Sequence, residues 1–202
     1  MSPSAPVHPI HQIITLPVRR SPRKGRHVLQ TGSSPPRLDG LVVLVVDATT
    51  GVGRELATRL SAAGAVVAVV GAGHPDRGDD AATNAAFLCK ALSDAGLLAL
   101  PYRIDVRDPA EAGRLPAQIA ADAAPVNAAV VVLPAPDASG ELADAFRAVS
   151  AALAAALPPG ARHIERTPAA AAGPETTTAG DRTWLRSVVD SLAADAARAT
   201  SR

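Results

Sequence analysis

The stretch that decides the fold reads Val45-Val46-Asp47-Ala48-Thr49-Thr50-Gly51-Val52-Gly53. It closes the apolar run 41–46, which is short and rich in β-branched residues, as in a strand buried on both faces. From residue 56 to 63 apolar residues recur at helical spacing, and Gly64 suits the position after a helix end. Glycine in a strand-to-helix turn lets an anion approach the backbone beside a helix N-terminus, which favours negative charge. The stretch therefore predicts a buried strand, an anion-binding turn and a helix.

The alternation of strand and helix continues along the chain. Apolar runs predict further strands at 65–70, 97–104 and 126–133, and a poorer one at 161–167, where charged residues interrupt the pattern. Helical periods predict four further helices. Asp79 or Asp80 caps the first, and the second begins at 109 with a kink or late restart at Pro116. The third spans 141–157, and Asp181 caps the fourth. This order predicts an α/β fold: a doubly wound, Rossmann-like parallel sheet of about five strands in a three-layer α/β/α arrangement.

The near-neutral net charge conceals a split between two parts of the chain. Residues 1–40 hold six basic residues and one acidic residue, whereas residues 41–202 hold 14 basic and 18 acidic ones. We expect residues 1–38 to be a disordered, basic, Pro- and Ser-rich tail and residues 39–202 to form the domain. The basic run 18–27 has two other interpretations, a nucleic-acid patch or a twin-arginine export signal. Because the apolar run 41–46 is too short for a signal core, we expect a solvated tail without a specific nucleic-acid partner.

Composition excludes several classes of protein. A single cysteine, Cys89, cannot form a disulfide within the chain or a zinc cluster, and we expect it to be a small core residue. His8 and His11 lie in the predicted tail, so we expect no metal site there. No apolar run approaches the roughly 18 residues of a membrane span. We therefore expect a soluble, cytoplasmic protein without a bound metal.

Four motifs in the right order resemble the short-chain dehydrogenase/reductase family over about residues 41–199. Residues 46–53 stand where that family has roughly Thr-Gly-x-x-x-Gly-Ile-Gly, and residues 60–67 resemble its Leu-Ala-x-x-Gly-Ala-x-Val. Asp105-Val106-Arg107-Asp108 is similar to the family's Asp-Val-x-Asp, and residues 191–195 to its Ser-Leu-Ala-x-Glu. The resemblance implies a Rossmann fold that binds NAD or NADP.

The resemblance also implies which residues would contact the cofactor. They lie in the turn after the first strand and at the end of the third strand, where the family's aspartate and the next backbone group hold the adenine: Asp47, Thr49, Thr50, Gly51, Val52, Gly53, Asp105 and Val106. Two glycines in a turn also fit a purely structural role, and Asp105 fits a strand-end cap equally well. The choice between NAD and NADP stays open, because Asp76 could accept a ribose hydroxyl and Arg77 a 2′-phosphate.

Several residues depart from the family pattern. Asp47 replaces the first glycine of the turn, and its carboxylate would repel a pyrophosphate. Residues 131–134 replace the family's Asn-Asn-Ala-Gly segment. The family's Tyr-x-x-x-Lys pair aligns with Thr178 and Arg182, and its catalytic serine falls near Arg166 and Thr167. An aliphatic hydroxyl is far less acidic than a phenol, whose pKa is about 10, so Thr178 cannot take over the tyrosine's role as acid and base.

No other residue restores the family's catalytic group. Tyr102, the single tyrosine, lies in the predicted third strand, and the two lysines, Lys24 and Lys90, lie in the tail and the predicted second helix. Neither Asn84 nor Asn127 lies on the helix where the family keeps its proton-relay asparagine. His163 has no carboxylate in an identifiable orienting position. We therefore predict no catalytic residue.

Three interpretations of function follow. The first is a non-catalytic family member that binds NAD(P) weakly or not at all and acts through a partner. The second is an NAD(P)-dependent oxidoreductase of carbonyls or alcohols whose site uses other residues or a partner subunit. The third is a non-functional remnant, since the chain stops where the family continues into a lid. We expect a homo- or hetero-oligomer through helices 141–157 and 181–199, the pair that forms the family's dimer, with Trp184 as an anchor.

Overall fold

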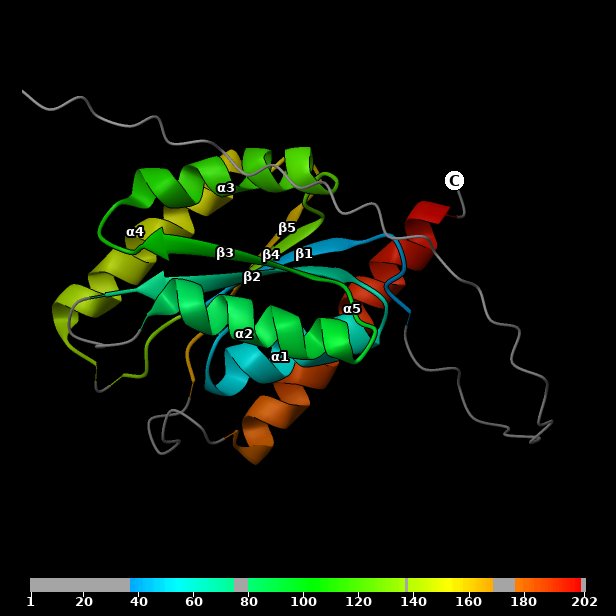
Figure 1. Ribbon diagram of the computed structural model, residues 1–202, viewed down its shortest axis with the longest axis horizontal. Helices are drawn as coiled ribbons and strands as arrows, with labels where there is room; N and C mark the ends of the chain where they lie inside the picture. The colour runs from blue at the N-terminus through cyan, green and yellow to red at the C-terminus, as the bar shows by residue number, and fades with distance from the viewer. Residues whose placement is uncertain (1–36, 75–79, 137, 169–176, 201–202) are drawn as a thin grey trace, which may run out of the picture. The chain divides into compact units, whose positions relative to one another are not determined.

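The computed structural model describes residues 37–74, 80–136, 138–168 and 177–200, all within the compact unit Ser34–Arg202. Their elements alternate along the chain: β1 (Val42–Val46), α1 (Gly51–Ala62), β2 (Val66–Gly73), α2 (Ala81–Asp94), β3 (Ala99–Asp105), α3 (Pro109–Asp122), β4 (Ala128–Val132), α4 (Gly140–Ala156), β5 (Arg162–Arg166) and α5 (Ala179–Thr200). Figure 1 shows them in this order from blue to red. The predicted sequence of strands and helices is confirmed.

The five strands form one parallel sheet in the order β3-β2-β1-β4-β5. Val43 of β1 pairs with Val67 of β2 on one side and with Ala128 of β4 on the other, so β1 lies at the centre. The chain therefore runs outward twice from β1, which is the doubly wound arrangement that the sequence predicted. In such sheets ligands bind beyond the carboxyl ends of the strands, where the strand order reverses. That point lies between β1 and β4.

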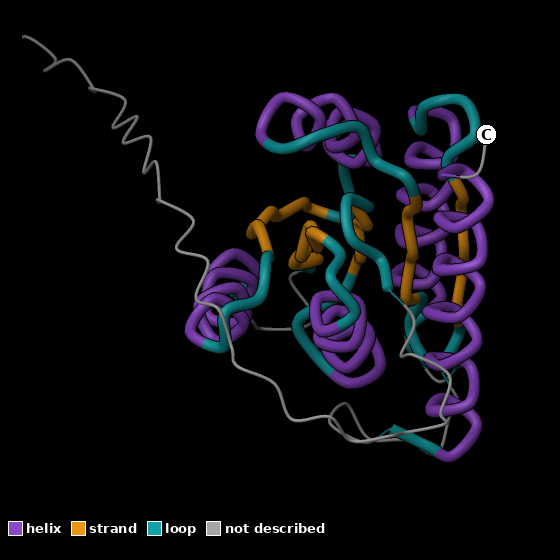
Figure 2. The backbone as a smooth tube through the Cα atoms, turned by 90° about the vertical axis from the view of Figure 1, so that its right-hand side faces the viewer, coloured by secondary structure: helices purple, strands orange, loops and turns teal. Residues whose placement is uncertain are grey.

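Helices cover both faces of the sheet (Figures 1 and 2). Val43 and Val45 of β1 point to one face and pack in a core with residues of α1, α2 and α5. Val42 and Leu44 point to the other face and pack with residues of α3 and α4. Both cores are apolar, so the central strand is buried on both sides, as its unbroken apolar sequence predicts.

Helix α5 lies on the same face as α1. Its residues Leu185, Val188 and Leu192 belong to the α1 core, whereas Phe146 and Val149 of α4 belong to the opposite one. Parallel strands are joined by right-handed crossovers, so a helix leading to a strand outside β5 would share the face of α4. The predicted common interface of helices 141–157 and 181–199 is wrong as one surface, because the sheet separates the two helices. Oligomerisation itself stays a prediction.

Three local predictions differ from the structure. Pro116 lies inside α3, which continues as one helix, so a late restart there is wrong. The last helix starts at Ala179, and Thr178 precedes its first turn, so Asp181 is not its capping residue. Leu38, which the sequence placed in the tail, is fully buried and its amide donates to the Ala63 carbonyl at 2.8 Å. Residues before 37 lie outside the described part.

Candidate functional site

The turn after β1 is shaped by two residues with positive φ angles and by a main-chain hydrogen bond to β2. Asp47 is buried and adopts a positive φ of 58°, in the left-handed region that favours glycine, and Gly51 has a φ of 48°. The Ala48 amide donates to the Val70 carbonyl at 3.2 Å, which ties the turn to β2. Aspartate tolerates the left-handed region better than most residues, so Asp47 replaces the family's glycine without opening the turn.

Gly53 has a structural reason to be glycine. A Cβ atom at this position would lie 2.1 Å from the Asp47 carbonyl oxygen, far inside van der Waals contact. The first turn of α1 can therefore lie against the end of β1 only because residue 53 lacks a side chain. Packing alone explains this glycine, and it says nothing for or against a ligand.

The start of α1 keeps groups that fit a phosphate. The Thr50 side chain makes no capping hydrogen bond, and the first intrahelical bond runs from Arg54 to the Thr50 carbonyl. The N–H groups of residues 51–53 therefore have no partner within the helix, and they face the direction from which an anion would approach. No acidic side chain occupies the first turn of α1. Backbone geometry thus fits a pyrophosphate, whereas the Asp47 carboxylate opposes it.

The two residues predicted to hold the adenine are already bonded within the chain. The Asp105 carboxylate accepts bonds from the Arg107 amide at 2.9 Å and from the Arg107 guanidinium at 2.5 Å. These bonds from Arg107 hold the pKa of Asp105 at about 2. The Val106 side chain is fully buried, and its amide donates to the Gly73 carbonyl at 3.2 Å. Asp105 therefore acts as a strand-end cap, and any contact with adenine stays a prediction.

A hollow of about 390 Å³ lies where β2 and β3 end and α2 begins. Arg103 and Arg107 line it together with the carboxylates of Asp80 and Asp105. Asp80 accepts from the Thr83 amide at 3.0 Å and so caps α2, as the sequence predicted. Asp76 and Arg77, the candidates for distinguishing NAD from NADP, lie outside the described residues.

A capping box occupies the place where the family has its catalytic tyrosine. The Thr178 hydroxyl accepts from the Asp181 amide at 3.1 Å, and the Asp181 carboxylate accepts from the Thr178 amide at 3.1 Å and from its hydroxyl at 2.6 Å. Such reciprocal bonds satisfy donors that a helix start otherwise leaves without partners. Thr178 thus has a complete structural role at the start of α5.

An ion pair joins this helix start to the end of β5. Arg166 donates to Asp181 at 2.7 Å, and the Asp181 side chain is fully buried. The Arg166 guanidinium also lies 5.3 Å from the centroid of the Trp184 ring, a cation–π distance. Burial alone would raise the pKa of Asp181, but hydrogen bonds from Thr178 and Arg166 outweigh it and lower the pKa. Trp184, predicted as an interface anchor, packs within its own chain.

The other polar residues of this region also have partners. Glu55 of α1 forms an ion pair with Arg59 at 2.5 Å, and Thr177 hydrogen-bonds to Glu55. The start of α5 therefore lies beside the first turns of α1. Arg182, which aligns with the family's lysine, is exposed on α5 and lies close enough to Glu55 to lower the pKa of that carboxyl, which burial alone would raise.

Tyr102 and Cys89 lie in the core. The Tyr102 hydroxyl donates to Asp122 of α3 at 2.8 Å, and burial followed by this carboxylate raises the pKa of the phenol far above its usual range. Burial also raises the pKa of the Cys89 thiol to about 11. These raised pKa values make both groups poor proton donors and acceptors near neutral pH.

The structure reveals one polar cluster that the sequence did not predict. Ser150 of α4 lies 2.9 Å from His163 Nε2 and donates to Glu165 at 2.5 Å, which gives His163 a neighbouring carboxylate after all. The sequence could have indicated that His163 and Glu165 lie together, because alternate residues of a β-strand point to the same face. Ser150 is fully buried, and its hydroxyl links both side chains of β5 to α4.

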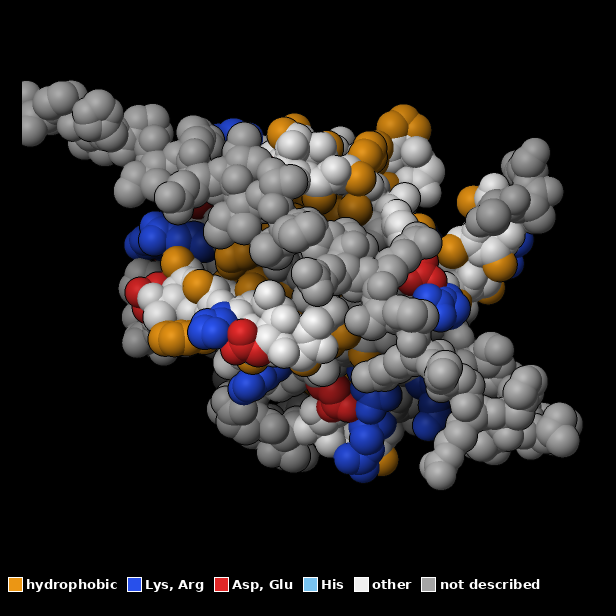
Figure 3. Space-filling model, turned by 45° about the vertical axis from the view of Figure 1, so that its right-hand side comes forward, with side chains coloured by type: hydrophobic (Ala, Val, Ile, Leu, Met, Phe, Trp, Pro, Cys, Tyr) orange, Lys and Arg blue, Asp and Glu red, His pale blue; other side chains and the backbone are white. Residues whose placement is uncertain are grey.

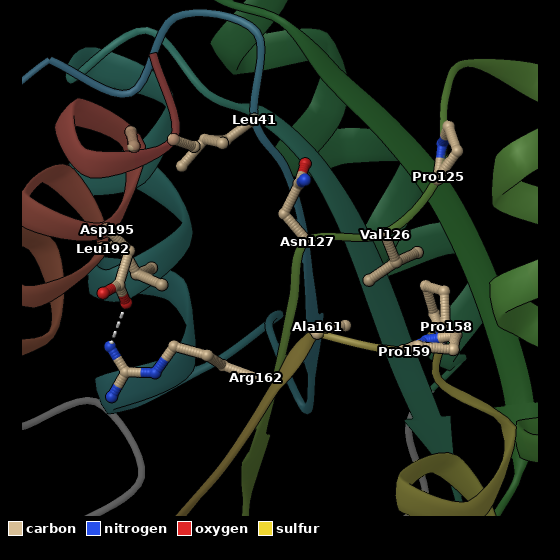
Figure 4. A pocket seen from close by; sticks show the side chains of 13 residues that line it. Leu41, Pro125, Val126, Asn127, Pro158, Pro159, Ala161, Arg162, Leu192 and Asp195 are labelled. Atoms are coloured by element: carbon tan, nitrogen blue, oxygen red, sulfur yellow. Dashed lines mark hydrogen bonds and ion pairs between the residues drawn. The ribbon is translucent and has the colours of Figure 1, made fainter. Parts of the chain in front are cut away.

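A second hollow, of about 350 Å³, opens at the amino ends of the strands (Figure 4). Leu41, Asn127 and the segment 158–162 line it on one side and the second half of α5 on the other. The Arg162–Asp195 ion pair, 2.8 Å long, crosses this region between β5 and α5. The hollow lies at the edge of the sheet opposite the turn 47–53, so it is separate from the predicted cofactor site.

Charged side chains of both signs share the surface of the described residues. Basic and acidic side chains lie close to one another on the face drawn in Figure 3. The part of the chain that the structure describes contains no group of three or more side chains suited to hold a metal ion. Within that same part, no helix is long and apolar enough to span a membrane.

The chain was compared with known proteins. No protein-family model and no curated protein matches it. Among solved structures it is similar to a short-chain type dehydrogenase/reductase from Mycobacterium marinum, with 25% identity over 59% of this chain and 51% of that chain and a TM-score of 0.48. It is also similar to a short-chain dehydrogenase/reductase from Serratia marcescens, with 20% identity over 77% and 66% of the two chains and a TM-score of 0.49.

A third neighbour is a variant of the actinorhodin polyketide ketoreductase with NADPH, with 27% identity, coverage of 57% and 47% and a TM-score of 0.44. The matched part of this chain spans about half of the first and third neighbours. The first two of these neighbours are short-chain dehydrogenases/reductases, the family that the sequence motifs resemble.

Proposed function

We propose that this chain is a Rossmann-fold protein of the short-chain dehydrogenase/reductase type that binds NAD or NADP weakly and does not carry out the family's tyrosine-dependent hydride transfer. The observation that carries the proposal is the cluster of Thr178, Asp181 and Arg166. At the place where the family's tyrosine and serine align, each of these polar groups is used to fix α5 to β5.

Proton transfer is the step that this region lacks. Hydride transfer to a carbonyl requires a group that donates a proton near neutral pH, and the most effective donors have a pKa close to the working pH. Thr178 offers an aliphatic hydroxyl that already donates to Asp181. Arg166 is engaged in the ion pair with Asp181. The lowered pKa of Asp181 keeps it ionised, so it cannot donate a proton either.

Weak cofactor binding follows from the turn after β1. When bound, a nicotinamide dinucleotide would supply or accept the hydride. The N–H groups of residues 51–53 and the hydroxyls of Thr49 and Thr50 would hold its pyrophosphate. Asp47 lies in the same turn, and its negative charge would act against the same phosphates. These two contributions oppose each other, which supports an affinity well below that of a site with glycine at position 47.

Fluorescence titration of the full chain with NADH and NADPH tests the binding part of the proposal. We expect half-saturation near the millimolar range for the protein as it is, and tighter binding after Asp47→Asn. No detectable binding by either protein would remove the cofactor from the proposal.

Steady-state turnover tests the catalytic part, with generic carbonyl substrates and either reduced cofactor. We expect no turnover above that of the Thr178→Ala variant. Turnover that this substitution abolishes would instead establish the alternative, an oxidoreductase with an unconventional site. A cytoplasmic location stays a prediction, which fractionation of the native cells checks.

A further inference from the structure

The outer edge of β5 has no neighbouring strand among the described residues. The Arg162 amide donates to the Asn127 carbonyl at 3.0 Å, and the Arg166 carbonyl accepts from the Leu133 amide at 2.7 Å. In a parallel ladder alternate residues face the neighbouring strand, so Arg162, Ile164 and Arg166 use their main-chain groups toward β4. The N–H and C=O groups of His163 and Glu165 therefore point away from β4, toward the outer edge of the sheet. No other described residue forms a main-chain hydrogen bond with them.

Helix α5 does not lead to a strand beside β5 within the described residues. A strand placed directly after α5 and paired outside β5 would need a crossover helix on the face of α4. Helix α5 packs instead in the core of α1, on the opposite face. Helix α5 therefore does not have the position of a right-handed crossover to a strand outside β5.

The two arginines of β5 form ion pairs within the chain. Charges on an edge strand often prevent pairing with another molecule. Here Arg162 donates to Asp195 at 2.8 Å and to Ser191 at 2.5 Å, as Figure 4 shows for the ion pair with Asp195. Arg166 pairs with Asp181 in the same way. Both arginines are thus held against α5. Their charges therefore do not prevent another strand from pairing with the outer edge of β5.

We propose that two copies of the chain associate through β5, which pairs antiparallel with β5 of the second copy about a two-fold axis at Ile164. In this register His163 stands opposite Glu165 of the partner subunit, and Glu165 stands opposite the partner's His163. These are the residues whose main-chain groups point outward, and such a pair exchanges both of its N–H···O=C bonds. The inference concerns assembly and does not depend on the proposed function.

The side chains also match in this register. Each outward pair brings an imidazole against a carboxylate on one face of the sheet, and such opposite pairs stabilise antiparallel strands. Ile164 meets the partner's Ile164 on the other face, where it is partly buried beside the α1 core. Ser150 already holds the side chains of His163 and Glu165 on the first face. The five residues of β5 are therefore self-complementary when one copy is reversed.

The flanking helices supply the rest of the interface. A strand of five residues buries much less than the roughly 1,200–2,000 Å² of a specific interface. A two-fold axis perpendicular to the sheet places α4 beside the partner's α4 on one face and α5 beside the partner's α5 on the other. The two helices that the sequence predicted as one interface would then contribute separately, on opposite faces of a continuous sheet.

Charge exchange between two variants tests the register. Glu165→Lys places a lysine opposite the partner's His163, and His163→Glu places two carboxylates opposite each other. Glu165→Lys removes the favourable imidazole–carboxylate pair, and His163→Glu places like charges directly opposite each other. Because the symmetry doubles either effect, we expect each variant to weaken the dimer about tenfold or more. An equimolar mixture of the two variants restores opposite charges at both pairs, so we expect a heterodimer from two proteins that are monomeric alone. Light scattering after size exclusion, over a range of concentrations, measures the masses.

Two controls complete the experiment. Asp94→Lys makes the same charge change at an exposed position of α2, a helix outside the proposed interface, and we expect it to leave the mass of the dimer unchanged. Hydrogen exchange of the His163 and Glu165 amides should slow as the protein concentration rises. A monomer at all concentrations overturns the proposal, and so does failure of the mixed variants to associate. Amides protected in a monomer, independent of concentration, overturn it as well, because another segment of the same chain then covers the edge.

Discussion

The Arg166 guanidinium lies 2.7 Å from the carboxylate of Asp181, which has no solvent-exposed surface. This pair joins the carboxyl end of β5 to the first turn of α5. Thr178 completes the contact by bonding to the second oxygen of the same carboxylate at 2.6 Å. A region that serves proton transfer in the family that the chain resembles thus has a structural role here, with consequences for stability that can be measured.

Asp181→Ala should destabilise the protein strongly, because it leaves the Arg166 charge partly buried without a partner. Breaking a buried pair from one side costs roughly 3–5 kcal/mol. The Arg166 side chain is 27% exposed, so solvent screens it, and we expect about 2–4 kcal/mol. Urea unfolding measures the change. Asp190→Ala, at an exposed position of the same helix, should change stability by less than about 0.5 kcal/mol. Equal losses in the two variants would contradict the role of the pair.

Thr178→Ala should remove the capping bonds of α5 and lower the free energy of unfolding by about 1 kcal/mol, the usual effect of losing an N-cap side chain. Thr178→Ser keeps a hydroxyl at this position, so we expect it to retain most of the stability. Both variants should have the same oxidoreductase activity as the unmodified chain, at the background level. A loss of turnover in Thr178→Ala that exceeds its loss of folded protein would argue for a catalytic hydroxyl.

Asp47→Asn should strengthen the binding of NADH and NADPH. It removes the carboxylate from the turn, and asparagine also tolerates the left-handed backbone that this position requires. We expect roughly tenfold tighter binding, about 1.4 kcal/mol, in fluorescence titrations at low salt. Asp39→Asn removes the same charge before the other end of β1 and should leave the affinity unchanged. An Asp47→Asn protein with unaltered affinity would show that this carboxylate does not act on the cofactor.

Gly53→Ala should unfold or severely destabilise the domain whether or not cofactor is present. The added methyl group would lie 2.1 Å from the Asp47 carbonyl oxygen, so α1 would have to move away from β1. We expect a loss of more than about 3 kcal/mol in thermal or urea unfolding, since overpacking against rigid backbone is costly. Gly140→Ala adds the same group in open space at the start of α4, and it should stabilise by about 0.5–1 kcal/mol. A tolerated Gly53→Ala would contradict the close approach.

The Asp105–Arg107 pair should lose its contribution to stability in acid. The Arg107 guanidinium and amide lower the pKa of Asp105 to about 2, against about 3.9 in an unfolded chain. A lowered pKa means that the stabilisation is complete above about pH 4 and disappears as the pH falls toward 2. Carbon-13 NMR of the carboxyl group measures this titration. Arg107→Ala should return the pKa of Asp105 close to its ordinary value, whereas Arg114→Ala, beside Asp108, should not. An unshifted Asp105 in the unmodified protein would refute the assignment.

Local sequence signals were sufficient for the elements and their order. The apolar run before Asp47 is long enough for one strand and β-branched throughout most of its length, so it predicted β1 within one residue. Asp80 and Asp108 accept from amides of the helices that follow them, as residues of this type before a helix usually do. Near the end of the chain the same reasoning chose Asp181, because the reciprocal use of Thr178 is not visible without coordinates.

The sequence by itself determined the doubly wound sheet and the turn after β1, because strand burial and helical period are local properties. Only the tertiary structure decided that α5 lies against α1 and that Arg166 meets Asp181, because these contacts join residues whose spacing in the sequence has no period. It also decided that β5 ends the sheet with its outer main-chain groups unpaired by described residues. A charged strand is a poor central strand by composition, and its position at the edge, beside the carboxylates of α5, is the physical reason it folds.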